Sequence, residues 1–259
     1  MPAQWVDENN NAMETTGWWN CIAKADFDKD GDVDFLLGNQ GLNGVLNPTQ
    51  SHPVYVYKKD YDKNGSPDPV VGKYFPVKEG KKLLPLHSRD DIVAQLPILK
   101  RKYLRYDDFT KVSFEQLLNI KDLESETLNA KIFASSYAEN LGNGKFRLVP
   151  LPLECQVAPI NDILVNDFDQ EGQYDALLVG NDFSSEAIYG RADALTGLLL
   201  KGKKGYFEVM PSKDSGFYVP GQSNHLTFLT DKNGRRIILA TQNNDSLLIL
   251  PTSITLGLK

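Results

Sequence analysis

Five aspartates stand within nine consecutive positions of this chain: Asp26, Asp28, Asp30, Asp32 and Asp34. Carboxylates this close in one folded loop repel one another strongly unless a cation lies among them. Four of them fill the first, third, fifth and ninth positions of a loop whose sixth residue is Gly31, where a calcium loop turns sharply. The spacing therefore predicts a calcium loop, in which the seventh residue, Asp32, offers its backbone carbonyl.

The residues that follow this loop decide its type. An EF-hand closes its loop with a bidentate Glu at the twelfth position and continues into a helix, but the twelfth residue here is Leu37. Residues 33–37 are mainly apolar and end at Gly38-Asn39, which is typical of a short buried strand. We therefore expect a calcium loop inside a β-hairpin.

Two further copies of the loop occur along the chain. Residues 60–71 repeat the ligand types and the glycine, with Val71 at the twelfth position. Residues 167–178 do so with Glu171 at the fifth position and Leu178 at the twelfth. The apolar twelfth residue excludes an EF-hand in both copies. A fourth turn, at residues 229–237, has apolar residues at the first and ninth ligand positions, and we expect it to fold without metal.

A second repeated unit, a hairpin with a glycine turn, is found at residues 138–146 and again at residues 200–207. A loop hairpin followed by a glycine hairpin gives the four antiparallel strands of a propeller blade. The sequence thus predicts an all-β fold, a β-propeller with three to four blades' worth of four-stranded units, as a single domain or propeller fragment over residues 1–259. Such a number is awkward for a closed ring, so a partner or the remaining blades of a longer parent protein are expected to complete it, unless the ring closes in an unusual way.

One segment, residues 88–128, departs from this β pattern. Ser88 with Asp91, and Ser113 with Gln116, have the spacing of helix capping boxes, and apolar residues follow each at helical spacing. Pro97 is expected to kink or divide the first helix. We predict a helical insertion that packs against the propeller face.

These motifs together resemble FG-GAP or VCBS repeat proteins, which build integrin-α-like β-propellers with calcium in the blade hairpins. More narrowly, Gly17-Trp18-Trp19-Asn20, residues 38–43 and Gln95-Leu96-Pro97 resemble the C-terminal region of large VCBS-repeat proteins of Bacteroidetes that are linked to the ASPIC/UnbV group. The resemblance covers nearly the whole chain. It implies two to three structural calcium ions.

The resemblance also implies a ligand set for each loop. The first set is Asp26, Asp28, Asp30, Asp32 through its carbonyl, and Asp34. The second is Asp60, Asp62, Asn64, Ser66 through its carbonyl, and Asp68. The third is Asp167, Asp169, Glu171, Gln173 through its carbonyl, and Asp175. Glu171 departs from the family pattern, because its longer side chain reaches further than an aspartate.

Composition narrows the class of partner and the location. The net charge of −6 lies largely in the aspartate loops, and no basic stripe suggests nucleic acid. No stretch is long enough to span a membrane, and the first residues lack the apolar core of a secretion signal. Calcium loops of this kind are useful mainly outside cells, so we expect a piece of an exported parent protein located extracellularly, in the periplasm or at the cell surface. Cys21 and Cys155 are expected to be free thiols.

A convergent catalytic set is missing from the sequence. The three histidines lack a metal-ligand partner at short spacing, and no serine elbow or phosphate loop is present. We therefore expect a binding or scaffolding module for a carbohydrate or protein ligand, not an enzyme. The alternative is a carbohydrate-active enzyme, a glycoside hydrolase or lyase, with its site on the propeller face or the helical insertion. Asp90 with Asp91 and Glu124 with Glu126 could be paired carboxylates for glycosidic hydrolysis, but their positions are typical of helix-start charges and a solvated turn. Ligand-stacking candidates are Trp18, Trp19, Tyr74, Phe75, Tyr189, Phe217 and Tyr218.

Overall fold

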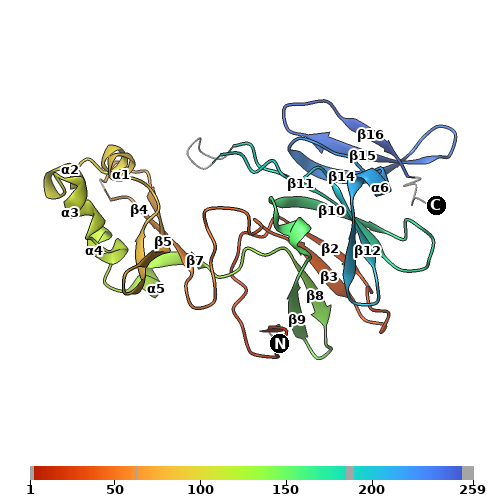
Figure 1. The fold of residues 1–259 in the computed structure, drawn as a ribbon, viewed down its shortest axis with the longest axis horizontal. Helices are drawn as coiled ribbons and strands as arrows, with labels where there is room; N and C mark the ends of the chain where they lie inside the picture. Colours follow the sequence, from red (N-terminus) through yellow and green to blue (C-terminus); the bar gives the residue numbers. More distant parts are fainter. Residues whose placement is uncertain (1–2, 62, 185–189, 253–259) are drawn as a thin grey trace. The chain divides into compact units, whose positions relative to one another are not determined.

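The computed structural model of the chain describes residues 3–61, 63–184 and 190–252 (Figure 1). The fold is mainly β, with four small sheets. The chain divides into two compact units. Unit 1 comprises residues 1–14, 18–45 and 133–259, and unit 2 comprises residues 15–17 and 46–132. Unit 2 is therefore an insertion in the sequence of unit 1.

Unit 1 contains three of the sheets. The first has the order β1-β9-β8-β3-β2 and is formed by β1 (Gln4–Val6), β2 (Cys21–Ala25), β3 (Asp34–Gly38), β8 (Ser136–Asn140) and β9 (Lys145–Pro150). The second is an antiparallel meander of β10 (Ile160–Asn166), β11 (Asp175–Gly180), β12 (Leu198–Gly202) and β13 (Phe207–Met210). The third consists of β14 (Ser223–Thr230), β15 (Arg236–Gln242) and β16 (Leu248–Pro251). Two single turns of helix, η1 (Leu153–Gln156) and α6 (Ser212–Ser215), connect them.

The three sheets of unit 1 pack face to face. Strand β11 shows why, because every one of its residues is buried. Successive side chains of a strand point to opposite faces, so Leu178 contributes to the apolar cluster shared with the first sheet, and Leu177 to the cluster shared with the third. Strand β10 contacts both β2 and β14. A strand buried on both faces thus makes the second sheet the middle layer.

The predicted pairing of a loop hairpin with a glycine hairpin is confirmed. In the second sheet the four strands follow one another directly. In the first sheet, β2 and β3 are joined by β8 and β9, although residues 46–132 intervene in the sequence. The mainly β prediction is confirmed as well. No propeller ring is detected among the described residues, so the propeller stays a prediction.

Unit 2 has a sheet of its own, with the order β6-β5-β4-β7. Its strands are β4 (Val54–Lys59), β5 (Asp68–Val77), β6 (Gly80–Pro85) and β7 (Thr127–Ala130). Its helices are α1 (Arg89–Gln95), α2 (Leu99–Lys102), α3 (Tyr106–Thr110), α4 (Phe114–Leu118) and α5 (Leu123–Glu126). The hairpin of the second acidic loop, β4–β5, therefore belongs to unit 2.

The helices form where the capping signatures predict them. Ser88 caps α1 and Ser113 caps α4, each in a complete capping box, and Pro97 lies between α1 and α2. Their apolar faces pack on the sheet of unit 2, in a cluster that includes Tyr57 and Phe114. This sheet contains the second acidic hairpin, and the expectation that the helices pack against a propeller face stays a prediction. The sequence pattern shows an apolar face, but it does not show which sheet covers that face.

Candidate metal centres

The first acidic loop, loop 1 (residues 26–34), connects β2 to β3 (Figure 1). Its backbone enters the left-handed region at Lys29, with φ of 65°, and at Gly31, with φ of 101°. Glycine is favoured at such a φ, because a side chain is strained there. The resulting tight turn gathers Asp26, Asp28 and Asp34, whose ligand atoms lie within 4.8 Å of one another.

Hydrogen bonds position these carboxylates. Asp34 is fully buried and accepts three bonds: from the backbone N–H of Phe27 (3.1 Å), from the Tyr137 hydroxyl (2.8 Å) and from the N–H of Asn140 (2.8 Å). Asp26 Oδ2 accepts from the N–H of Gly31 at 3.2 Å. The backbone thus turns the loop carboxylates towards its centre.

Two oxygens of loop 1 lack any hydrogen-bond partner although they are buried: Asp26 Oδ1 and Asp32 Oδ1. A buried acceptor without a partner is costly. Calcium binds six to eight oxygens at about 2.3–2.6 Å, which brings its ligands within the spacing seen here. The residues of loop 1 therefore fit a calcium ion. The sequence predicts that Asp32 offers its backbone carbonyl, whereas the structure has a buried side-chain oxygen of Asp32 that could bind the ion.

The electrostatics of loop 1 also favour a bound cation. Burial raises the pKa of Asp28 to about 6. The hydrogen bond from the backbone N–H of Asp30 lowers this pKa, and the negative charges of Asp34, Asp30 and Asp26 raise it further. Burial, with the nearby carboxylates that include Glu139, likewise raises the pKa of Asp32 above its usual value. Loop 1 thus holds charges that the metal-free fold disfavours.

Loop 3 (residues 167–175), between β10 and β11, repeats this frame. Asp167 Oδ2 accepts from the N–H of Gly172 at 2.8 Å, and Asp175 Oδ2 accepts from the N–H of Phe168 at 3.1 Å. The ligand atoms of Asp167, Asp169 and Asp175 again lie within 4.8 Å of one another. Three buried oxygens, Asp167 Oδ1, Asp169 Oδ2 and Gln173 Oε1, accept no hydrogen bond, although a lysine ammonium lies near the second of them. This triad too could hold a metal ion.

Loop 3 differs in having a lysine beside its carboxylates. Lys201 of β12 places its Nζ 2.7 Å from Asp169 Oδ2 and 3.6 Å from Glu171 Oε1. Burial acts to raise the pKa of Asp169, but the contact with Lys201 and the N–H bond from Glu171 bring it below its usual value. The contact with Asp169 raises the pKa of Lys201 in turn. Sequence reasoning missed Lys201, which lies in the glycine hairpin far along the chain.

Loop 2 (residues 60–68), in unit 2, shares the frame in its described part. Asp60 Oδ2 accepts from the N–H of Gly65 at 2.9 Å, and Asp68 Oδ2 accepts from the N–H of Tyr61 at 2.9 Å. Asn64 Oδ1 accepts from the N–H of Ser66 at 2.8 Å. Asp62, a predicted ligand, lies outside the described residues.

The fourth turn has a charged partner for its aspartate, because Arg235 Nε donates to Asp231 Oδ2 at 2.8 Å.

The carboxylates considered for catalysis have structural contacts. Asp91 completes the capping box of α1, and Asp90 forms an ion pair with Arg89 at 2.8 Å. Glu124 accepts from the Tyr55 hydroxyl at 2.7 Å. Glu126 accepts the backbone N–H groups of residues 121 and 122. Each of the four acids therefore has a structural contact within unit 2.

The aromatic candidates divide into buried and exposed side chains. Phe217 is buried in unit 1, whereas Tyr218 is 55% exposed and Trp18 is 38% exposed beside Phe133. Tyr189 lies outside the described residues. The other candidates, Trp19, Tyr74 and Phe75, are half-buried.

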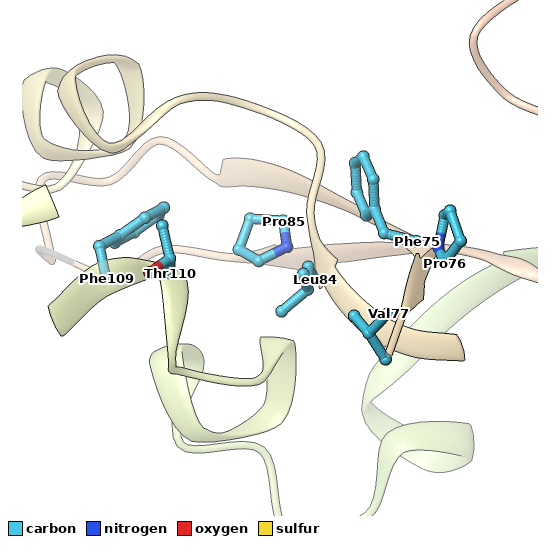
Figure 2. Close-up of a pocket in the computed structure, with 7 residues that line it drawn as sticks. All are labelled: Phe75, Pro76, Val77, Leu84, Pro85, Phe109 and Thr110. Atoms are coloured by element: carbon cyan, nitrogen blue, oxygen red, sulfur yellow. The ribbon is translucent and has the colours of Figure 1, made fainter. Parts of the chain in front are cut away.

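A cavity of about 220 Å³ opens in unit 2 beside Phe75. In the view of Figure 2, Pro85 lies between Phe75 and Phe109. The lining consists of Phe75, Pro76, Val77, Leu84, Pro85, Phe109 and Thr110. With Thr110 as its one hydroxyl side chain and no charged one, this cavity offers apolar contact rather than chemistry.

Both cysteines are free, as expected: Cys21 is half-buried and Cys155 is buried. Burial raises the pKa of each thiol to about 12, which disfavours the reactive thiolate form. Among the described residues, no helix is long and apolar enough to cross a membrane. Comparison with known protein families, with curated proteins and with solved structures finds no match to this chain.

Proposed function

We propose that this chain is a calcium-stabilised β-propeller module of the FG-GAP or VCBS type that serves as a binding or scaffolding part of a larger surface or exported protein. The observation that carries the proposal is loop 1. It combines three convergent carboxylates with two buried oxygens that lack a partner. Calcium would supply the missing positive charge and the missing contacts, and its task is structural.

The contact between loop 1 and the apolar core gives this structural task a mechanism. Phe27, the second residue of the loop, is 1% exposed and lies edge-on to Phe207 of the second sheet, with ring centroids 5.3 Å apart. Its N–H is held by Asp34. An ion bound to Asp34 would therefore fix the aromatic side chain that joins the first two sheets.

The face-to-face sheets support the propeller part of the proposal. Consecutive sheets of unit 1 share apolar clusters, and β10, an edge strand of the second sheet, contacts the edge strands β2 and β14 of the other two. Neighbouring blades of a propeller pack in this way. The loops lie at hairpin turns, as in the calcium-binding propellers that the sequence resembles.

Thermal unfolding with calcium and with a chelator tests the proposal. We expect calcium to raise the melting temperature of the wild-type chain, because an ion that binds only the folded state stabilises it by about 2.7 kcal/mol at a hundredfold excess over Kd. Asp28→Asn should lose much of this gain. Asp108→Asn, which removes an exposed aspartate in α3, is the matched control and should keep it. Equal melting temperatures with and without calcium would contradict the proposal.

The binding role rests on exposed aromatic surface, with Tyr218 the most exposed of the described candidates. Aromatic rings of this kind stack on sugars or insert into partner proteins. A glycan array probed with calcium-loaded protein tests the carbohydrate branch, with Tyr218→Ala as the variant that should lose signal. A blank array, together with specific capture of a protein partner that the chelator abolishes, would favour the scaffolding branch.

A further inference from the structure

Loops 1 and 3 make equivalent hydrogen bonds to the strand beside them, so the neighbouring residue on that strand can be compared between the two loops. Asp34 accepts the N–H of Asn140, and Asp175 accepts the N–H of Gly202. These two donors occupy equivalent places on β8 and β12. The residue just before each donor is Glu139 in the first sheet and Lys201 in the second. The chain therefore places opposite charges at the same position beside two similar acidic loops.

The Lys201 side chain contacts loop 3 rather than Glu208, its neighbour across the sheet. Its register partner on β13 is Glu208, yet the ammonium lies 2.7 Å from Asp169 Oδ2. The side chain of Lys201 is 15% exposed and that of Asp169 only 3%. An ion pair this sheltered is screened far less than one in open solvent. Glu139, in contrast, is negatively charged and so cannot neutralise loop 1, and it forms an ion pair with Arg147 at 2.8 Å.

We propose that Lys201 is a built-in cation that competes with calcium for loop 3, so that loop 3 is neutralised by the protein itself while loop 1 depends on the ion. This inference rests on the proposed function, because it concerns which of the acidic loops takes the metal. Calcium could enter loop 3 only by displacing the ammonium from Asp169. The charge at one position of the glycine hairpin thereby decides whether a blade needs metal.

Equilibrium dialysis with calcium alone, on the full chain, tests this. Lys201→Gln removes the charge and keeps a polar side chain that is one atom shorter, so the variant should bind one additional calcium, or bind it at least about tenfold more tightly than wild type. Lys201→Arg keeps the charge and should show no gain. Lys203→Gln is the matched surface control, since Lys203 lies 4.0 Å from Glu171 and is 32% exposed.

A second substitution locates the additional ion. Adding Asp169→Asn to Lys201→Gln should abolish the gain, because it removes a carboxylate that would bind the additional ion. If Lys201→Gln binds no more calcium than wild type, or if the gain survives the added Asp169→Asn, the inference is wrong. Wild-type binding that is lost in Asp28→Asn would still uphold the proposed function in that case. The two failures are therefore distinguishable.

Discussion

Loop 1 and loop 3 have nearly the same backbone and opposite surroundings. Both gather the ligand atoms of three aspartates within 4.8 Å of one another. In both, the carboxylate at the ninth position accepts a hydrogen bond from the backbone N–H of the second residue. At the third position of the loop, however, the pKa of Asp28 is raised, whereas that of Asp169 is lowered. Burial acts upward on both, and Lys201 reverses the outcome in loop 3. The comparison teaches that one loop frame can be balanced by an ion or by a side chain.

The largest expected effect concerns the aromatic residue at the second position of each loop. Phe27 is 1% exposed between the first two sheets, whereas Phe168 is half-buried beside Phe228. Phe27→Ala should lower the free energy of unfolding by about 3–5 kcal/mol, and Phe168→Ala by about 1–2 kcal/mol, because less apolar contact is lost there. Denaturant unfolding measures both. Equal losses would show that loop 1 has no special place in the core.

The next largest effects on the free energy of unfolding are expected at the ninth position of each loop, Asp34 and Asp175. Asp34→Ala leaves three donors without an acceptor, from Phe27, Tyr137 and Asn140, whereas Asp175→Ala leaves two. In calcium buffer we expect losses of about 3 kcal/mol and about 2 kcal/mol in the free energy of unfolding. A smaller loss for Asp34→Ala than for Asp175→Ala would contradict the ranking.

Substitutions at the third position of each loop should change the free energy of unfolding in opposite directions in the absence of calcium. Asp28→Asn removes a charge that the fold disfavours, so it should stabilise the metal-free protein by about 0.5–1 kcal/mol. Asp169→Asn breaks the ion pair with Lys201 and should destabilise it by about 1 kcal/mol. Urea unfolding in chelator measures both changes. Shifts of the same sign would remove the distinction between the two loops.

The smallest expected effect is a pH dependence. The pKa of Asp28 is about 6 in the folded chain and near 3.8 when unfolded, so the folded state takes up a proton first as the pH falls. Metal-free protein should therefore gain stability between pH 7 and pH 5, by about 0.5 kcal/mol after allowance for solvent screening. Asp169 has a lowered pKa, and its contribution is lost only as the pH falls below the unfolded value. Asp28→Asn should lack the gain, and parallel stability curves for the variant and wild type would contradict this assignment.

Local sequence signals predicted much of this molecule. The aspartate spacing with Gly31 and an apolar twelfth residue placed loop 1 in a hairpin, and Ser88 with Asp91 placed the start of α1. These features depend on neighbours in the sequence. The extent of unit 2 was not predicted, because β7 pairs with β4 across a long stretch of chain. Lys201 was missed for the same reason, since its contact with Asp169 exists only once β12 lies beside β11.

Anomalous diffraction from crystals grown in calcium tests the central claim most directly, because it locates each ion. The account predicts a calcium peak among Asp26, Asp28 and Asp34 in loop 1. In loop 3 it predicts the Lys201 ammonium beside Asp169, with no peak. A calcium ion in loop 3 with Lys201 turned away, or a loop 1 without calcium, would contradict it.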